Sequence, residues 1–156
     1  MKDALLVQLD NTYSCFQRST GSLAEEDSNF TPVDGTFTVA NQVAHVAQTI
    51  DWFIDGVFSP DGFSMDFQAH EQKVRTVSSL SKAQDWVKRA VENARQLLAN
   101  KSEEEWATSM PAGPVMGGLP RATIFNGITD HTAHHRGALT AYARALGKTP
   151  PNPYVD

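Results

Sequence analysis

One stretch of the chain, residues 118–147, constrains the fold most, because its apolar side chains repeat at helical spacing and two histidines lie in the middle of the repeat. Glycine and proline are expected to open this helix at residues 118–120 and to close it after residue 146. The predicted stripe contains Ile124, Ile128, His131, His135, Ala138, Leu139, Tyr142 and Leu146. His131 and His135 are four residues apart, so their Cβ atoms lie about 6 Å apart and both rings can reach one metal ion. The pattern predicts half of a metal site.

Three further segments, residues 3–18, 36–58 and 81–100, have the pattern of amphipathic helices. Thr36 or Thr38 can cap the second, and residues 81–84 match a capping box at the start of the third. Residues 102–105 are expected to add one short turn, and the Pro- and Gly-rich residues 111–118 are not helical. Four amphipathic helices predict an all-α four-helix bundle, formed as a single domain over residues 1–156.

The connection between the second and third helices is unusually long. Residues 59–79 contain Pro60 and Gly62 and have no dominant period, so we expect an extended crossover from one end of the bundle to the other. Such a crossover leaves the second and third helices parallel.

Composition narrows the classes of function. A chain of 156 residues with 40% hydrophobic and 20% charged residues is typical of a soluble globular protein. The net charge is −5 and the basic residues are scattered, which argues against nucleic-acid binding. There is no apolar run that could span a membrane and no export signal, so we expect a cytoplasmic protein. The single cysteine, Cys15, excludes an internal disulfide and a Cys-rich zinc site.

A third metal ligand must come from outside the histidine helix. The candidates are His45, His70, Asp51, Asp55 and Asp66. His45 is the best placed because a helix holds a ligand more rigidly than the connection that carries His70. Three protein ligands leave open coordination positions, as in catalytic metal sites. Imidazole donors suit Zn, Ni, Cu or Fe, so the residue types alone do not select the metal.

Two familiar metal sites do not fit the sequence. The His131 to His135 spacing matches the helix of zinc metalloproteases, but position 132 is Thr where that motif needs a Glu as general base. A di-iron carboxylate centre needs Glu-x-x-His pairs, and no Glu in this chain precedes a His by three residues.

Two motifs resemble the DinB/YfiT-like family of metalloenzymes. They are the segment Asn41-Gln42-Val43-Ala44-His45-Val46 and the run Asp130-His131-Thr132-Ala133-His134-His135-Arg136-Gly137. The resemblance spans most of the chain and implies a four-helix bundle with a crossover between helices two and three, frequent dimers, and one divalent ion held by His45, His131 and His135. The family includes bacillithiol and mycothiol S-transferases and mycothiol-dependent maleylpyruvate isomerase. Its run usually continues with Gln or Asn, whereas Gly137 is followed here by Ala138.

The first functional hypothesis is a metal-dependent enzyme of this family, with one Zn or Ni ion and open coordination positions. The most concrete form is a homodimeric S-transferase in which a low-molecular-weight thiol binds the ion as thiolate and attacks a small electrophile; a hydrolase is the other form. His134 and Asp130 are expected to hydrogen-bond the ligands from outside the coordination sphere.

Two alternatives remain. One is a non-catalytic bundle that binds a metal or a small apolar ligand, for example in a stress response. Its pocket would be lined by residues near the long connections: Met65, Phe67, Trp106, Met110 and Met116. The other is a buried hydrogen-bonded histidine cluster that binds no metal.

Overall fold

The computed structural model describes residues 1–155, and four long helices dominate them. The long helices are α1 (Lys2–Thr20), α2 (Val39–Gly56), α4 (Leu80–Asn100) and α6 (Ile124–Ala145). Two short helices, α3 (Phe67–Arg75) and α5 (Glu103–Ala107), and two 3-10 turns, Glu25–Asp27 and Arg121–Thr123, lie in the connections. The described residues form no β-strand, only one isolated bridge between Ser109 and Pro120. The all-α prediction is confirmed.

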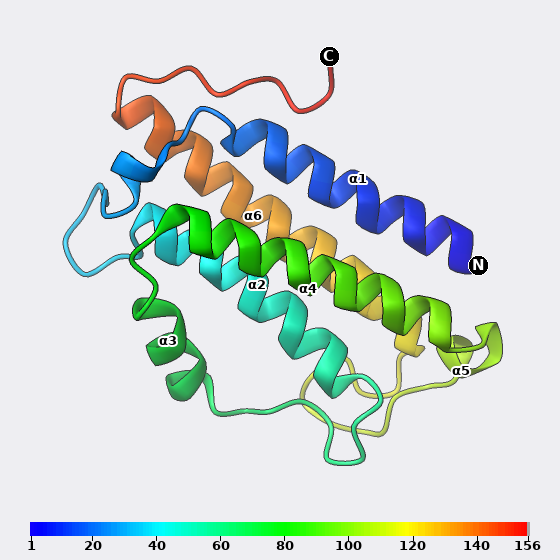
Figure 1. The fold of residues 1–156 in the computed structure, drawn as a ribbon. Helices are drawn as coiled ribbons and strands as arrows, with labels where there is room; N and C mark the ends of the chain where they lie inside the picture. Colours follow the sequence, from blue (N-terminus) through cyan, green and yellow to red (C-terminus); the bar gives the residue numbers. More distant parts are fainter. Residues whose placement is uncertain (156) are drawn as a thin grey trace.

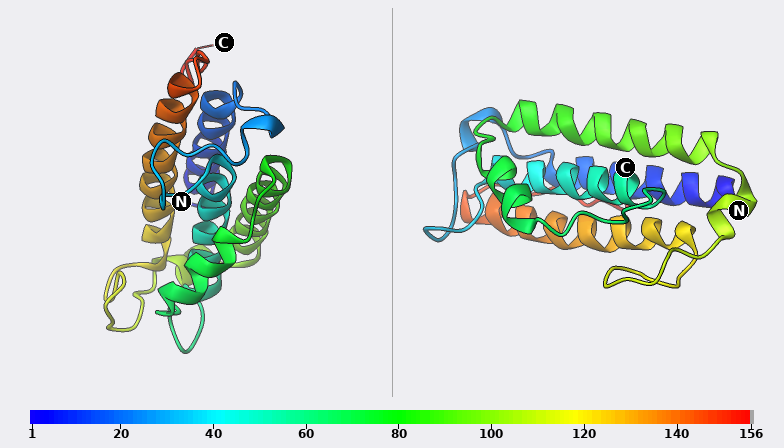
Figure 2. Two further views of the ribbon diagram at one scale, coloured as in Figure 1. Left: turned by 90° about the vertical axis from the view of Figure 1, so that its left-hand side faces the viewer. Right: turned by 90° about the horizontal axis from the view of Figure 1, so that it is seen from below.

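The four long helices form the predicted bundle. Helix α2 packs against α4 and α6, and α1 packs against α6 and α4. Figure 1 shows that α2 and α4 run in one direction and α1 and α6 in the other. The predicted crossover between two parallel helices is therefore confirmed. Figure 2 shows the long helices side by side, and the crossover with α3 runs along them from one end of the bundle to the other.

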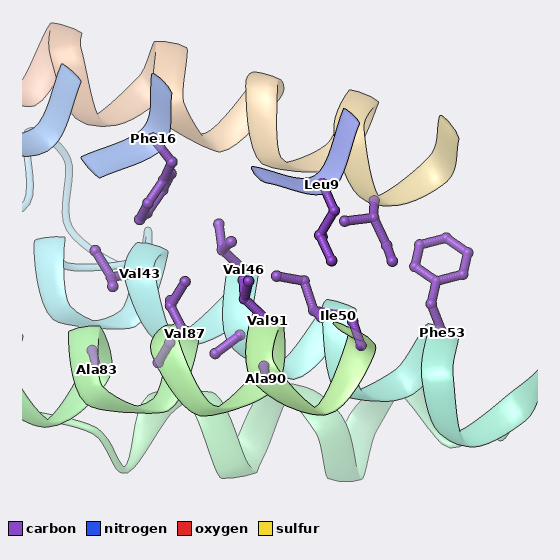
Figure 3. Packing of buried hydrophobic residues seen from close by; sticks show 14 of the residues in the cluster. Leu9, Phe16, Val43, Val46, Ile50, Phe53, Ala83, Val87, Ala90 and Val91 are labelled. Carbon is purple, nitrogen blue, oxygen red and sulfur yellow. The ribbon is translucent and has the colours of Figure 1, made fainter. Parts of the chain in front are cut away.

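Helix α2 supplies the centre of the core. Its apolar stripe is buried along its whole length and consists of Val39, Val43, Val46, Ile50 and Phe53, with Val57 directly after its last residue. In Figure 3 the α2 side chains Val43, Val46, Ile50 and Phe53 face small or branched residues of α4 and two side chains of α1: Ala83, Val87, Ala90 and Val91, and Leu9 and Phe16. Burying one Val, Leu, Ile or Phe side chain contributes about 1.5 to 3 kcal/mol, so this shared stripe holds the bundle together.

Helix α2 begins at a capping box that also fixes the crossover. The Thr38 hydroxyl accepts a hydrogen bond from the Asn41 backbone N–H (3.2 Å), and the Asn41 side chain accepts one from the Thr38 N–H (3.3 Å). The Asn41 amide also donates to the carbonyls of Val74 and Val77. Of the two expected caps, Thr38 is the one used.

The capping box expected at residues 81–84 is wrong. Helix α4 begins at Leu80, and its N-cap is Ser79, whose hydroxyl accepts from the Lys82 N–H at 3.3 Å. Leu80 is buried in the core, so the helix begins one residue before Ser81. The Ser81 backbone N–H donates to the Glu25 carboxylate.

The crossover contains helix α3, which was not predicted. Asp66 caps it by accepting from the Ala69 N–H at 3.0 Å. Only Val74 of this short helix is buried, so its sequence has no apolar period to reveal it. Trp52 of α2 holds the segment in place, because its indole N–H donates to the Ser64 carbonyl at 2.7 Å.

The last helix begins later than residues 118–120, the start expected from the sequence. Pro120 caps the 3-10 turn at Arg121–Thr123, and α6 follows at Ile124. Its end is as expected: Gly147, at φ +75°, donates its N–H to the Arg144 carbonyl.

The short turn α5 and the non-helical residues 111–118 are also confirmed. Among residues 1–155, every helix is too short or too polar to cross a bilayer.

Two glycines inside α6 lie in different surroundings. A Cβ at Gly127 would lie 2.6 Å from Phe53 Cζ and 2.8 Å from Met116 Cε, whereas a Cβ at Gly137 would meet nothing within 4 Å. Gly127 is therefore a close packing position between α6, α2 and the 111–118 connection.

We expect Gly137→Ala to raise the free energy of unfolding by about 0.5 to 1 kcal/mol, since alanine favours the helix interior. Gly127→Ala should instead lower it by about 1 kcal/mol or more, because the added methyl overpacks against Phe53 and Met116. Urea denaturation of both variants and the parent protein measures the difference. Equal stabilisation by both substitutions would contradict the close packing at Gly127.

Candidate metal centre

Three histidines from two helices meet on one side of the bundle. His45 comes from α2, and His131 and His135 come from successive turns of α6. The His131 and His135 ring centroids are 4.4 Å apart, and the His45 centroid lies 4.9 Å from the first and 4.8 Å from the second. The structure thus brings together the three residues that the sequence singled out.

The nitrogen atoms are spaced for a shared cation. The Nε2 atoms of His131 and His135 lie 3.2 Å apart. Two nitrogens bonded to one ion at 2.0 to 2.1 Å with a tetrahedral angle would lie about 3.3 Å apart. One ligand atom from each of the three histidines falls within 4.8 Å of the others. Rotation of the His45 side chain would have to supply the remaining contraction, of about 1.5 Å.

The three rings are in the neutral form that a metal requires. Burial, and after it the neighbouring histidines, lower the pKa of His131 to about 4 and the pKa of His135 to about 3. Burial also lowers the pKa of His45, although a hydrogen bond with Gln48 opposes it. At neutral pH each ring therefore has a nitrogen lone pair available.

Gln42 fixes the orientation of His135. The His135 Nδ1 lies 2.5 Å from Gln42 Oε1, while the Gln42 Nε2 donates to the Tyr142 hydroxyl at 3.3 Å. That hydroxyl donates in turn to the Phe37 carbonyl at 3.1 Å. Because the Gln42 oxygen can only accept, the His135 proton sits on Nδ1, and its Nε2 lone pair points to the other rings.

Sequence reasoning missed Gln42 as a functional residue. The available signal was its place three residues before His45, which puts both on one side of α2. His134 and Asp130, from which such hydrogen bonds were expected, are both exposed. His134 makes an edge contact with the His135 ring at 4.9 Å, and within residues 1–155 neither residue hydrogen-bonds a ring of the cluster.

The other candidates for the third ligand lie outside the cluster. His70 Nε2 is paired with the Ser64 hydroxyl at 3.2 Å, and Asp66 caps α3. Asp51 accepts from the Trp86 indole N–H at 2.6 Å, and Asp55 is exposed. His45 is the candidate that the fold places beside His131 and His135.

Phe37 and Thr49 complete the walls around the rings. The Phe37 ring lies 5.3 Å from the His45 ring, and the guanidinium of Arg75 covers Phe37 at 4.8 Å. Arg75 also donates to the Gly35 carbonyl at 3.1 Å. The Thr49 hydroxyl lies 3.4 Å from His131 Nε2. One wall of the site is therefore aromatic, and the α2 wall offers a hydroxyl.

The cluster is poorly arranged for hydrogen bonding alone. His45 and His131 each have a buried Nδ1 with no hydrogen-bond partner in the described part of the chain. Leaving such a group unpaired costs about 1 to 3 kcal/mol. The Nδ1 of His45 is available to a cation, whereas the Nδ1 of His131, whose Nε2 faces His135, stays unpaired with or without one.

The residues expected to line a pocket have separate positions. Met65 and Met110 line a cavity of about 280 Å³ between the crossover and residues 110–115. Trp106 is fully buried in the core, Phe67 is exposed beside Trp52, and Met116 packs near the Gly127 backbone.

Cys15 is half-buried on α1, and its Sγ lies 3.8 Å from the Pro153 carbonyl. It is not a member of the histidine cluster.

Comparison with known proteins agrees with this geometry. A search of curated proteins finds no match to the chain. The model of the DinB family matches residues 11–156, which include all four long helices in whole or in part and the three clustered histidines. The sequence, the bundle and this match together show that the chain belongs to the DinB family.

Proposed function

We propose that the protein is a metal-dependent enzyme that binds one divalent cation through His45, His131 and His135. The observation that carries the proposal is the convergence of three neutral imidazoles, two of them with Nε2 atoms 3.2 Å apart. Zinc and nickel are the metals that we favour, since both accept imidazole donors.

The donor set favours an anionic substrate group. Three neutral imidazoles leave the charge of a divalent cation uncompensated, and no carboxylate of residues 1–155 belongs to the cluster. When bound there, the cation would lower the pKa of a thiol or water in an open coordination position. The half-buried rings of His45 and His131, the buried ring of His135 and the Phe37 side chain limit access of water, which strengthens attraction for an anion.

Among such reactions we favour the transfer of a low-molecular-weight thiol. A thiol ionises near pH 8.5, so a cation alone can hold it as thiolate, whereas a hydrolase commonly uses a carboxylate base that this cluster lacks. The thiolate sulfur would form a bond to the electrophilic carbon as the leaving group departs with its electron pair, and the thiol proton would pass to solvent. The DinB/YfiT-like family that the chain resembles includes thiol S-transferases, which supports the same reaction.

A second candidate is a non-catalytic bundle that binds a small apolar ligand. The cavity beside Met65 and Met110 favours it, because most of its other lining residues are apolar or glycine. A measurement of turnover distinguishes the metal-dependent enzyme from the binding bundle.

We expect His45→Ala, His131→Ala and His135→Ala each to lose most of the metal that the parent protein binds, because each removes one of three donors. His134→Ala is the matched control: it lies on the same helix, is exposed and should keep the metal. Elemental analysis after loading with Zn²⁺ or Ni²⁺ gives the metal content, and conjugation of 1-chloro-2,4-dinitrobenzene with a panel of small thiols gives turnover.

Equal metal content in all four variants would exclude the site. Full metal loading without turnover for any thiol would favour the binding bundle. Circular dichroism checks that each variant is folded.

We expect Gln42→Leu to weaken metal binding by about 10- to 100-fold, because the His135 ring loses the acceptor that fixes its proton on Nδ1. Gln42→Glu should retain binding, since a carboxylate also accepts from Nδ1. Competition with a chromogenic chelator measures the dissociation constants. If Gln42→Leu binds as tightly as the parent protein, the hydrogen bond does not control the site.

Metal affinity should change little as the pH falls from 7 to 5. A proton competes with the cation for each ring nitrogen, and it does so only near or below the pKa of that ring. The pKa values of about 4 for His131 and about 3 for His135, together with the lowered pKa of His45, move this competition below the ordinary pKa near 6.5. Chelator competition at several pH values tests this: a steep loss of affinity beginning at pH 6.5 would contradict it.

A further inference from the structure

The hydroxyl of Thr49 faces the histidine cluster from α2. Thr49 follows His45 by four residues, so the two lie on one face of the helix. The residue is 8% exposed, and its Oγ1 lies 3.4 Å from His131 Nε2. That nitrogen is one of the two that lie 3.2 Å apart. The hydroxyl is therefore next to the position at which a cation would bind.

Three other threonines in the long helices use their hydroxyl groups differently. Thr12, Thr20 and Thr140 each donate to a backbone carbonyl three or four residues earlier, at 2.7 to 2.8 Å. This local bond is the usual choice of a helical threonine. Within residues 1–155, Thr49 makes no such bond, and its hydroxyl instead points to the rings.

Metal binding would leave this hydroxyl without an acceptor. At 3.4 Å the contact with His131 is at the long limit for a hydrogen bond. Once the Nε2 lone pair of His131 is used for coordination, it can no longer accept. A buried hydroxyl that has lost its partner favours a new acceptor, and a group held at the open coordination position would be the nearest one.

We propose that Thr49 is a positioning residue whose hydroxyl donates a hydrogen bond to the anionic ligand at the open coordination position, a thiolate in the proposed reaction. This inference rests on the proposed metal site. Thr49 is the one residue whose hydroxyl, among those of the described residues, contacts a ring of the cluster. The Thr49 hydroxyl would thereby favour an anion over a neutral ligand at the cation and would orient that anion toward α2.

Cobalt-loaded protein with azide as the anionic probe tests the inference. Thr49→Val keeps the shape of the side chain and removes the hydroxyl, and Thr49→Ser keeps the hydroxyl. The visible absorption of Co²⁺ reports both the dissociation constant of the metal and that of azide. We expect Thr49→Val to bind Co²⁺ as the parent does and to bind azide about tenfold more weakly, with Thr49→Ser near the parent.

Thr132→Val is the matched control. Thr132 is buried next to His131 in the chain, and its hydroxyl has no partner among the described residues. Its loss should leave azide affinity unchanged. If Thr49→Val binds azide as tightly as the parent while Co²⁺ binding is intact, the role of Thr49 is wrong and the metal site stands. If Co²⁺ binds the parent and His131→Ala alike, the site itself is wrong, and the inference is overturned with it.

Discussion

The packing register between α2 and α6 is the constraint on which the candidate site depends. The two helices run in opposite directions, and three contacts define their register: Gln42 with His135, Thr49 with His131, and Phe53 near Gly127. The first two bring the site together, and the third is apolar packing that involves the core. A shift of one helical turn, about 5.4 Å, would separate His45 from its partners. The side of α2 that builds the core therefore also sets the geometry of the site.

Much of this arrangement could be predicted from periodicity. The spacing of apolar residues predicts the buried stripe of α2 and the histidine-bearing stripe of α6, because a helix that packs on one side must repeat its apolar residues. Helix α3 could not be read, since only Val74 of that segment is buried. The cap of α4 was misplaced by two residues because the choice between Ser79 and Ser81 depends on the burial of Leu80, which is a tertiary effect.

The three clustered histidines were predictable, but their surroundings were not. Spacing along one helix shows that His131 and His135 can converge, and the place of His45 on a second helix made it the best candidate for the third ligand, as the family resemblance also implies. The expectation that His134 and Asp130 support the rings followed from closeness in sequence, whereas Gln42 is 93 residues away from His135 along the chain. Contacts between helices depend on the register of the bundle, which a single sequence does not specify.

The contacts around the site form a closed path that links its two helices. From His135 the path passes through Gln42 and Tyr142 to the backbone of Phe37, whose ring packs on His45. Arg75, at the end of α3, covers the outer side of Phe37. Movement of the loop before α2 or of α3 would therefore change the contacts of both His45 and His135. Because a ligand that binds only the folded state stabilises it, a cation held by α2 and α6 would also stabilise this connected region.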